Sequence, residues 1–258
     1  MRFIAAVLLV CGAAYAAVET ETVVYREGGT ELRGYLARNP AVTEPMPGIL
    51  IVHDWNGLGE QAKNTARRLA ELGYAAFALD MYGEGKLAAD TAQAAEWSSA
   101  LKNDVALARR RFVAALDVLD EQPGVDPERI AALGYCFGGT IVLEMARLGV
   151  DVQAVVSFHG NLASQVPEDQ RDLAAAILVC HGADDPLVPR DEVKAFLDEM
   201  KAADARFEFI QYQGAVHSFT NPAANSEASR FHATAARRSW IAMLNFLELV
   251  FAGTQAYK

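Results

Sequence analysis

The sequence predicts an α/β fold, with a mainly parallel sheet and helices on both of its faces. Short, continuous apolar segments alternate with longer amphipathic segments along most of the chain. Strands that are apolar on both faces are typical of parallel sheets that helices cover on either side. About 240 of the 258 residues follow the N-terminal segment described next, enough for one large domain with a core of its own.

The first residues have the pattern of an export signal. Met1-Arg2 supplies a charged start, the next eight residues are apolar, and Ala14-Tyr15-Ala16 forms a small-x-small cleavage site. This apolar stretch is too short to span a bilayer. Cys11 would suit a lipoprotein site, but the valine before it is bulky where such sites use a small residue, and a buried N-terminal helix is the other alternative. We expect residues 1–16 to be removed and residues 17–258 to form a single exported domain, periplasmic or secreted, without membrane insertion.

An antiparallel hairpin is expected at the start of the mature chain. Its two strand-like segments are Thr22–Tyr25 and Glu31–Leu36, and Gly28-Gly29 between them supplies the turn. Short apolar runs then predict strands, and longer amphipathic stretches predict the helices between them. The further strands are expected at 48–53, 75–80, 130–133, 152–158, 176–181 and 207–212, and the helices at 61–72, 101–119, 140–148, 192–200 and 227–251.

Chemically reactive side chains recur where these strands end. Open parallel sheets carry their chemistry at the carboxyl ends of the strands, so we expect such residues to converge at one edge. The loop 160–171 and the segment 82–100 are expected to form the rim or a lid. The residues at the strand ends are His53, Asp54, Asp80, Cys136, His159, Asp185 and His217.

The segment Gly134-Tyr135-Cys136-Phe137-Gly138-Gly139 joins an expected strand to an expected helix. A G-x-C-x-G turn in this position is the cysteine form of the nucleophile elbow, which projects the reactive side chain above the sheet. Glycines fit beside the nucleophile because a side chain there would clash. The free N–H groups at the start of the helix favour a thiolate or an oxyanion. A buried cysteine before an ordinary glycine-rich turn is the alternative, and the residues downstream decide between the two.

A nucleophilic cysteine needs a base, and the base needs an orienting partner. In this architecture the chain order is nucleophile, acid, histidine. Asp185 follows a strand and is the acid candidate, with the adjacent Asp184 as second choice and a plain turn before proline as the structural alternative. His217, in the loop after the last strand, is the base candidate. His159 precedes the acid, so we assign it to substrate contact rather than to proton transfer.

Two backbone N–H groups are candidates for an oxyanion hole. One belongs to Phe137, directly after the nucleophile, and the other to Trp55, in the loop after the third strand. Removing one such donor typically costs about 3 kcal/mol of transition-state stabilisation, so that loop should be rigid. The Trp55 side chain could serve as a pocket wall at the same time.

With these three blocks in place, the chain resembles the dienelactone hydrolase family, the cysteine branch of the α/β-hydrolases. The matching blocks are Gly134–Gly139, Gly182–Pro189 and Gly214–Pro222, and the resemblance covers essentially the whole mature chain. It implies an α/β-hydrolase fold and a triad of Cys136, His217 and Asp185. It also implies hydrolysis of lactones or esters through a thioester intermediate, without a metal or an organic cofactor.

The chain departs from the family pattern in the loop after the third strand. Members that act on dienelactone carry a glutamate that interacts with the resting thiol, and the matching position here is Asp54, one methylene shorter. Asp54 either holds the thiol, steers His217 or caps its own loop. The arginines that bind the substrate carboxylate in that family have no recognisable counterpart. Tyr82 is a candidate for lining the substrate pocket.

The net charge of −10 argues against nucleic acid as a partner. The expected partner is a small lactone or ester. A broad carboxylesterase acting on acyclic esters is the enzymatic alternative, because ring preference depends on pocket shape. A non-catalytic exported binding module is the other, although all three triad positions are filled. The sequence does not indicate an oligomeric state.

Overall fold

The computed structural model describes residues 17–253, so the expected signal segment at 1–16 lies outside the described residues. The strands are β1 (Glu19–Glu27), β2 (Thr30–Arg38), β3 (Met46–Val52), β4 (Ala75–Leu79), β5 (Val125–Tyr135), β6 (Ala154–Phe158), β7 (Ala176–Gly182) and β8 (Phe207–Tyr212). The helices are α1 (Glu60–Glu71), α2 (Thr91–Asn103), α3 (Val105–Asp120), α4 (Phe137–Arg147), α5 (Arg190–Ala202) and α6 (Ala233–Phe251), with a short 3₁₀ turn at Glu168–Gln170.

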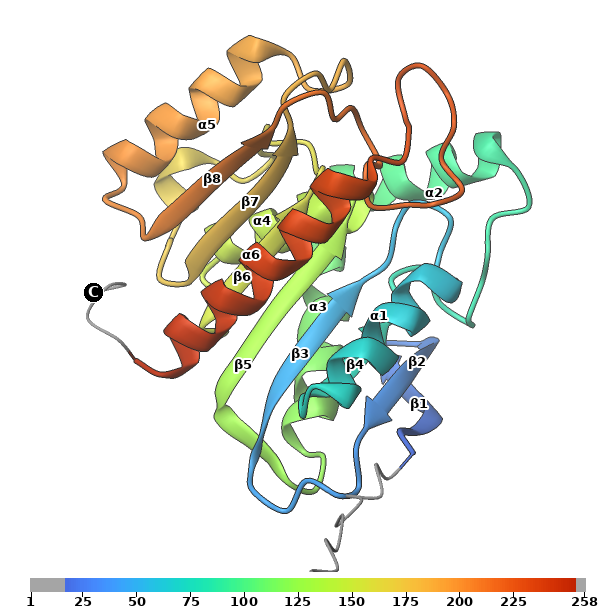
Figure 1. The fold of residues 1–258 in the computed structure, drawn as a ribbon. Coiled ribbons are helices and arrows are strands. Elements are labelled where there is room, and N and C mark those ends of the chain that lie inside the picture. The colour runs from blue at the N-terminus through green and yellow to red at the C-terminus, as the bar shows by residue number, and fades with distance from the viewer. Residues whose placement is uncertain (1–16, 254–258) are drawn as a thin grey trace, which may run out of the picture.

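All of these strands belong to one sheet, in the order β1-β2-β4-β3-β5-β6-β7-β8 (Figure 1). β1 and β2 form the expected antiparallel hairpin, with Gly28 at positive φ in its turn, and β2 pairs antiparallel with β4. The pairs from β4 through β8 are parallel. The predicted fold class is therefore confirmed.

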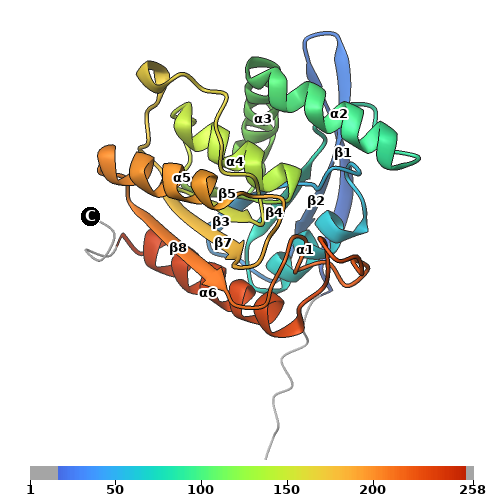
Figure 2. The ribbon, with the colours of Figure 1, turned by 90° about the horizontal axis from the view of Figure 1, so that it is seen from above.

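Helices cover both faces of the sheet (Figure 2). α1 and α6 pack on one face, where Leu69 and Phe246 belong to one apolar cluster. α3, α4 and α5 lie on the other face, and Phe112, Ile141 and Phe196 belong to a second cluster there. β4, β6 and β7 and the carboxyl-terminal halves of β3 and β5 are buried on both sides, which explains their continuous apolar runs, whereas the edge strand β8 is half-buried. Within residues 17–253, no helix has both the length and the apolar character needed to cross a bilayer.

Two predicted helices differ from the structure. The expected helix at 101–119 is broken at Asp104, whose backbone leaves the helical region (φ −111°, ψ 72°) and whose carboxylate accepts the Leu107 N–H as the cap of α3. The closing helix begins at Ala233 rather than at 227. Residues 218–232 instead form a loop, in which Ser229 makes an isolated β-bridge with His217. The His232 side chain accepts the Ala235 N–H as the N-cap of α6.

Candidate active site

Cys136 occupies the turn between β5 and α4. Its backbone has φ +55° and ψ −114°, a combination that is costly for any residue with a side chain. The Cys136 N–H donates to the Phe158 carbonyl at 3.0 Å, and the Thr140 N–H donates to the Cys136 carbonyl at 3.1 Å. These bonds hold the strained turn that the G-x-C-x-G pattern predicts.

The glycines of this turn are required by close backbone packing. A Cβ on Gly134 would lie 2.1 Å from the Gly138 carbonyl oxygen, and one on Gly138 would lie 2.3 Å from the Val52 carbonyl oxygen. Real Cβ atoms do not approach so closely, so only glycine fits. The first turn of α4 therefore rests directly on the carboxyl end of β3, beside the loop that carries Trp55.

The structure brings the predicted nucleophile, base and acid together. His217 Nε2 lies 3.1 Å from Cys136 Sγ, and His217 Nδ1 lies 2.9 Å from Asp185 Oδ2. The other carboxylate oxygen of Asp185 accepts the Leu187 N–H at 2.9 Å. His217 and Asp185 are buried, whereas Cys136 is partly exposed.

The choice between the two neighbouring aspartates is clear in the structure. Asp184 is exposed, and its carboxylate accepts the Gly214 N–H at 3.1 Å. Asp185 is the one that contacts the imidazole.

The electrostatic surroundings of His217 favour its protonated form. Burial opposes the charge, but hydrogen bonds to Asp185 and Cys136, together with the negative charges of these partners, outweigh burial and raise the pKa of His217 to about 10. The imidazole therefore carries a proton at neutral pH in this geometry. A protonated imidazole beside the sulfur stabilises the thiolate, which is the nucleophilic form of cysteine.

His159 lies against the base rather than on an open surface. It is only 2% exposed, and its ring meets the His217 ring edge to face at 5.2 Å between centroids. Its Nε2 lies 2.8 Å from the Thr220 hydroxyl. Burial and the neighbouring His217 charge lower the pKa of His159 well below its ordinary value, so it stays neutral. Substrate contact by this side chain stays a prediction; in the structure its ring contacts His217 and Thr220.

Asp54 caps the loop in which it lies. Its Oδ1 accepts the Asn56 N–H at 2.8 Å. Within the described part of the chain, its carboxylate makes no hydrogen bond to Cys136 or to His217. The contact is that of a loop cap, the third of the roles considered for this residue.

Tyr82 packs over the nucleophile turn. Its ring lies 5.7 Å from that of Phe137 and 5.4 Å from that of Trp97, between centroids. Its hydroxyl donates to the Trp55 carbonyl at 2.9 Å, and burial raises its pKa, so the phenol stays neutral. Tyr82 thus lines the region next to Cys136, and its hydrogen bond fixes the loop that contains Trp55.

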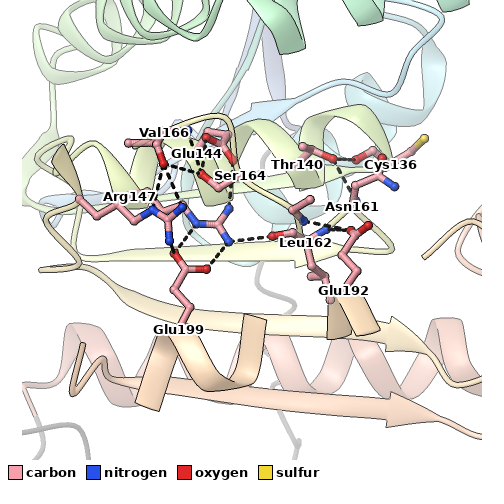
Figure 3. Close-up of polar contacts among 12 residues, drawn as sticks. Cys136, Thr140, Glu144, Arg147, Asn161, Leu162, Ser164, Val166, Glu192 and Glu199 are labelled. Atoms are coloured by element: carbon pink, nitrogen blue, oxygen red, sulfur yellow. Dashed lines mark hydrogen bonds and ion pairs between the residues drawn. The ribbon is translucent and has the colours of Figure 1, made fainter. Parts of the chain in front are cut away.

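Polar contacts join the loop at 160–171 to α4 and α5, as Figure 3 shows. The Asn161 N–H donates to the Thr140 hydroxyl at 3.0 Å, and the Thr140 hydroxyl lies 3.4 Å from the Cys136 carbonyl oxygen. Glu192 of α5 accepts the N–H groups of Leu162 and Ala163. This rim segment is therefore anchored beside the nucleophile turn.

Arg147 is the centre of the same network (Figure 3). It is 1% exposed, pairs with Glu199 at 2.7 Å and with Glu144 at 3.0 Å, and donates to the Leu162 carbonyl. Burial raises the pKa of Glu144 against the effect of Arg147. Sequence reasoning missed this network, although two charged residues in the otherwise apolar helix α4 signalled it.

Within residues 17–253, no group of three or more His, Cys, Asp or Glu side chains is placed to hold a metal ion.

Comparison with known proteins gives consistent results. The sequence model described as "Dienelactone hydrolase family" matches residues 32–251. A Yersinia pestis protein named "Putative carboxymethylenebutenolidase" is 29% identical over 84% of this chain and 84% of its own length. An uncharacterized Caenorhabditis elegans protein is 40% identical over 55% of this chain and 93% of its own length.

A solved structure is similar over nearly the whole chain. It is described as a dienelactone hydrolase-like promiscuous phosphotriesterase from metagenomic libraries, with 39% identity and a TM-score of 0.87. The match covers 91% of this chain and 99% of that one.

Proposed function

This chain belongs to the dienelactone hydrolase family and is a hydrolase, and from that premise we propose that Cys136, His217 and Asp185 cleave a lactone or small carboxylic ester through a thioester intermediate. One observation carries the proposal. Three distant segments supply a continuous hydrogen-bonded series, from Cys136 Sγ through both nitrogens of His217 to Asp185 Oδ2, with distances of 3.1 and 2.9 Å. Such a series is the arrangement by which a nucleophile is activated in acyl transfer.

The first half-reaction forms the acyl-enzyme. The thiolate of Cys136 attacks the ester carbonyl carbon, and the developing oxyanion accepts hydrogen bonds from the N–H groups of Phe137 and Trp55. Collapse of the tetrahedral intermediate breaks the C–O bond. His217 gives its proton to the departing alkoxide, which leaves a thioester on the sulfur and a neutral imidazole. In a lactone the departing alcohol stays attached to the acyl group.

The second half-reaction releases the acid. Neutral His217 takes a proton from a water molecule as the oxygen of that water attacks the thioester carbonyl carbon. The C–S bond breaks and the thiolate returns beside a protonated imidazole, whose charge Asp185 stabilises. Because a thiolate is a better leaving group than an amine, this cycle suits esters and lactones rather than amides.

The proposal is tested with Cys136→Ala on p-nitrophenyl acetate and dihydrocoumarin. We expect kcat to fall by at least about 1,000-fold, since removing a nucleophile disables the whole triad. The matched control is Cys180→Ala. Cys180 is buried 3.7 Å from the Tyr212 hydroxyl, and burial raises its pKa to about 12, so it should be inert and its loss should leave kcat within a few-fold. Unchanged turnover in Cys136→Ala would remove the mechanism.

A substrate panel separates the remaining alternatives. Preference for lactones over short acyclic esters supports a lactonase, and the reverse supports a broad carboxylesterase. A phosphotriester such as paraoxon belongs in the panel because the similar solved structure is described as a promiscuous phosphotriesterase. If the chain is a binding module without activity, iodoacetamide should show no selective reaction at Cys136.

We also propose that the protein is exported, on the pattern of residues 1–16. N-terminal sequencing of protein expressed with its first residues intact should find a chain that starts at Ala17. A chain that retains Met1 would contradict this proposal.

A further inference from the structure

We propose that His53 is a positioning residue whose ring aims the Trp55 N–H into the oxyanion hole. This inference rests on the proposed function, because it explains how one of the two donors is fixed. His53 directly follows β3, and its side chain is completely buried. Sequence reasoning placed it at the reactive edge of the sheet but gave it no role.

The hydrogen bonds of the ring fix its tautomer. The Met81 N–H points to His53 Nε2 at 3.2 Å, and a backbone N–H only donates, so Nε2 must be the unprotonated nitrogen. The proton therefore sits on Nδ1, which donates to the Asp54 carbonyl oxygen at 2.6 Å. Burial is the largest effect on this ring and lowers its pKa, which keeps it neutral. Both nitrogens are thus satisfied by backbone groups.

Holding the Asp54 carbonyl also sets the direction of the Trp55 N–H. These two groups belong to one peptide unit, which is trans, so the N–H points opposite to the carbonyl. The other polar groups of the turn are occupied. The Asp54 carbonyl also accepts the Gly57 N–H at 3.3 Å, Tyr82 donates to the Trp55 carbonyl, and the Asn56 N–H is bound by the Asp54 carboxylate. The Trp55 N–H has no acceptor in the described part of the chain, so it is a fixed donor free for a ligand.

The same ring ties this donor to the nucleophile turn. His53 stacks on Phe137 with 5.9 Å between ring centroids and meets Tyr82 at 4.8 Å. A Cβ on Gly138 would lie 2.6 Å from the His53 carbonyl oxygen, so the backbones of the two turns are also in direct contact. The two predicted oxyanion donors therefore lie on turns that share His53 as their common support.

Two amide substitutions separate the two nitrogens. His53→Asn places an amide near the position of Nδ1 and keeps a donor for the Asp54 carbonyl. His53→Gln reaches toward Met81 and loses that donor. Each variant is measured by kcat on p-nitrophenyl acetate and by the rate at which iodoacetamide alkylates Cys136. Alkylation needs the activated sulfur but forms no oxyanion. A residue that serves only the oxyanion hole therefore affects kcat and leaves the alkylation rate unchanged.

We expect His53→Gln to lower kcat by about 100-fold, at the lower end of the loss seen when an oxyanion donor is removed. Its alkylation rate should stay within about 3-fold of wild type, and His53→Asn should recover about 10-fold of the lost kcat, since it restores the bond that orients the donor. Equal kcat in wild type and His53→Gln would overturn the inference. Parallel loss of both rates would overturn it too, because the ring would then support the triad as a whole.

If the His53 variants do not fold, the inference can still be tested on the wild-type protein. The ¹⁵N spectrum of wild type should show His53 as a neutral ring protonated on Nδ1, and a ring protonated on Nε2 would overturn the inference. The proposed function fails by a different result. Hydrolysis at the wild-type rate in Cys136→Ala would remove the triad mechanism. Hydrolysis that depends on Cys136 but is unchanged in His53→Gln would remove only the role of His53.

Discussion

The two neighbouring aspartates after β7 differ in what they contact, and this difference gives a test of single residues. Asp185 binds His217 Nδ1 and raises its pKa, whereas Asp184 is exposed and binds the Gly214 N–H. Asp185→Asn removes a charge that raises the pKa of His217, so that pKa falls and less of the imidazole carries a proton at neutral pH. We expect kcat/KM to fall by about 10,000-fold, as in other triads that lose the acid charge.

The matched control is Asp184→Asn, for which kcat/KM should stay within about 3-fold of wild type, as expected for an exposed change away from the reacting atoms. Both variants are compared on p-nitrophenyl acetate between pH 5 and pH 10. Equal losses in the two variants would show that the contact with His217 is not what matters.

At the residue scale, sequence spacing predicted which three side chains the structure brings together. Cys136, Asp185 and His217 each follow a strand, and the parallel sheet brings strand ends together whatever the details of packing. His53 could not be assigned in this way, because its role depends on which backbone atoms its ring meets. That information exists only once Met81 and the Asp54 carbonyl are placed on either side of it.

Among the elements, strands were easier to predict than helix ends. β7 was expected at 176–181 and is observed at Ala176–Gly182, because its buried, mostly apolar run ends where the chain leaves the core. The break at Asp104 was missed because apolar spacing continues across it, and only the capping bond to Leu107 shows that a new helix starts. Local polar contacts of this kind compete with helical hydrogen bonds and leave little trace in hydrophobic spacing.

The contacts of α4 with α5 give a prediction about these elements. Arg147 is buried and joins Glu144 of its own helix to Glu199 of α5. Arg147→Leu should lower the free energy of unfolding by about 3 kcal/mol, because it leaves the buried Glu144 carboxylate without its ion-pair partner, whereas Glu199 keeps its pair with Arg171. The measurement is urea unfolding at neutral pH. Lys194→Ala is the control: its pair with Asp198 on the surface of α5 is exposed, and its loss should change the same free energy by about 0.5 kcal/mol or less. Similar values for both variants would contradict a special role for the buried network.

For the molecule as a whole, burying histidines at the reactive edge makes stability depend on pH. Burial is the largest effect on His53, His159 and His181, and it lowers the pKa of each below the ordinary value of 6.5. Above pH 6.5 these groups are neutral in both the folded and the unfolded chain and contribute nothing. Below pH 6.5 the unfolded chain binds protons that the folded chain does not, so the free energy of unfolding falls as the pH falls. The contribution of His217 to stability has the opposite sign, because its pKa is raised from 6.5 to about 10. This contribution is fully present below pH 6.5 and is lost as the pH rises toward 10.

His159 allows this dependence to be measured. Its backbone has φ +43°, a region that asparagine tolerates better than most residues, so His159→Asn removes the titrating ring with little backbone strain. Between pH 5 and pH 6, the free energy of unfolding from urea titrations should change with pH less steeply in this variant than in wild type, by up to about 1.4 kcal/mol per pH unit for one proton. The matched control is His232→Asn at the half-buried N-cap of α6, where asparagine also caps a helix; its slope is the reference for removing a histidine away from the reactive edge. Carboxylates contribute equally to all three proteins, so the difference isolates one histidine; identical slopes in His159→Asn and wild type would mean that the buried ring takes up its proton without unfolding.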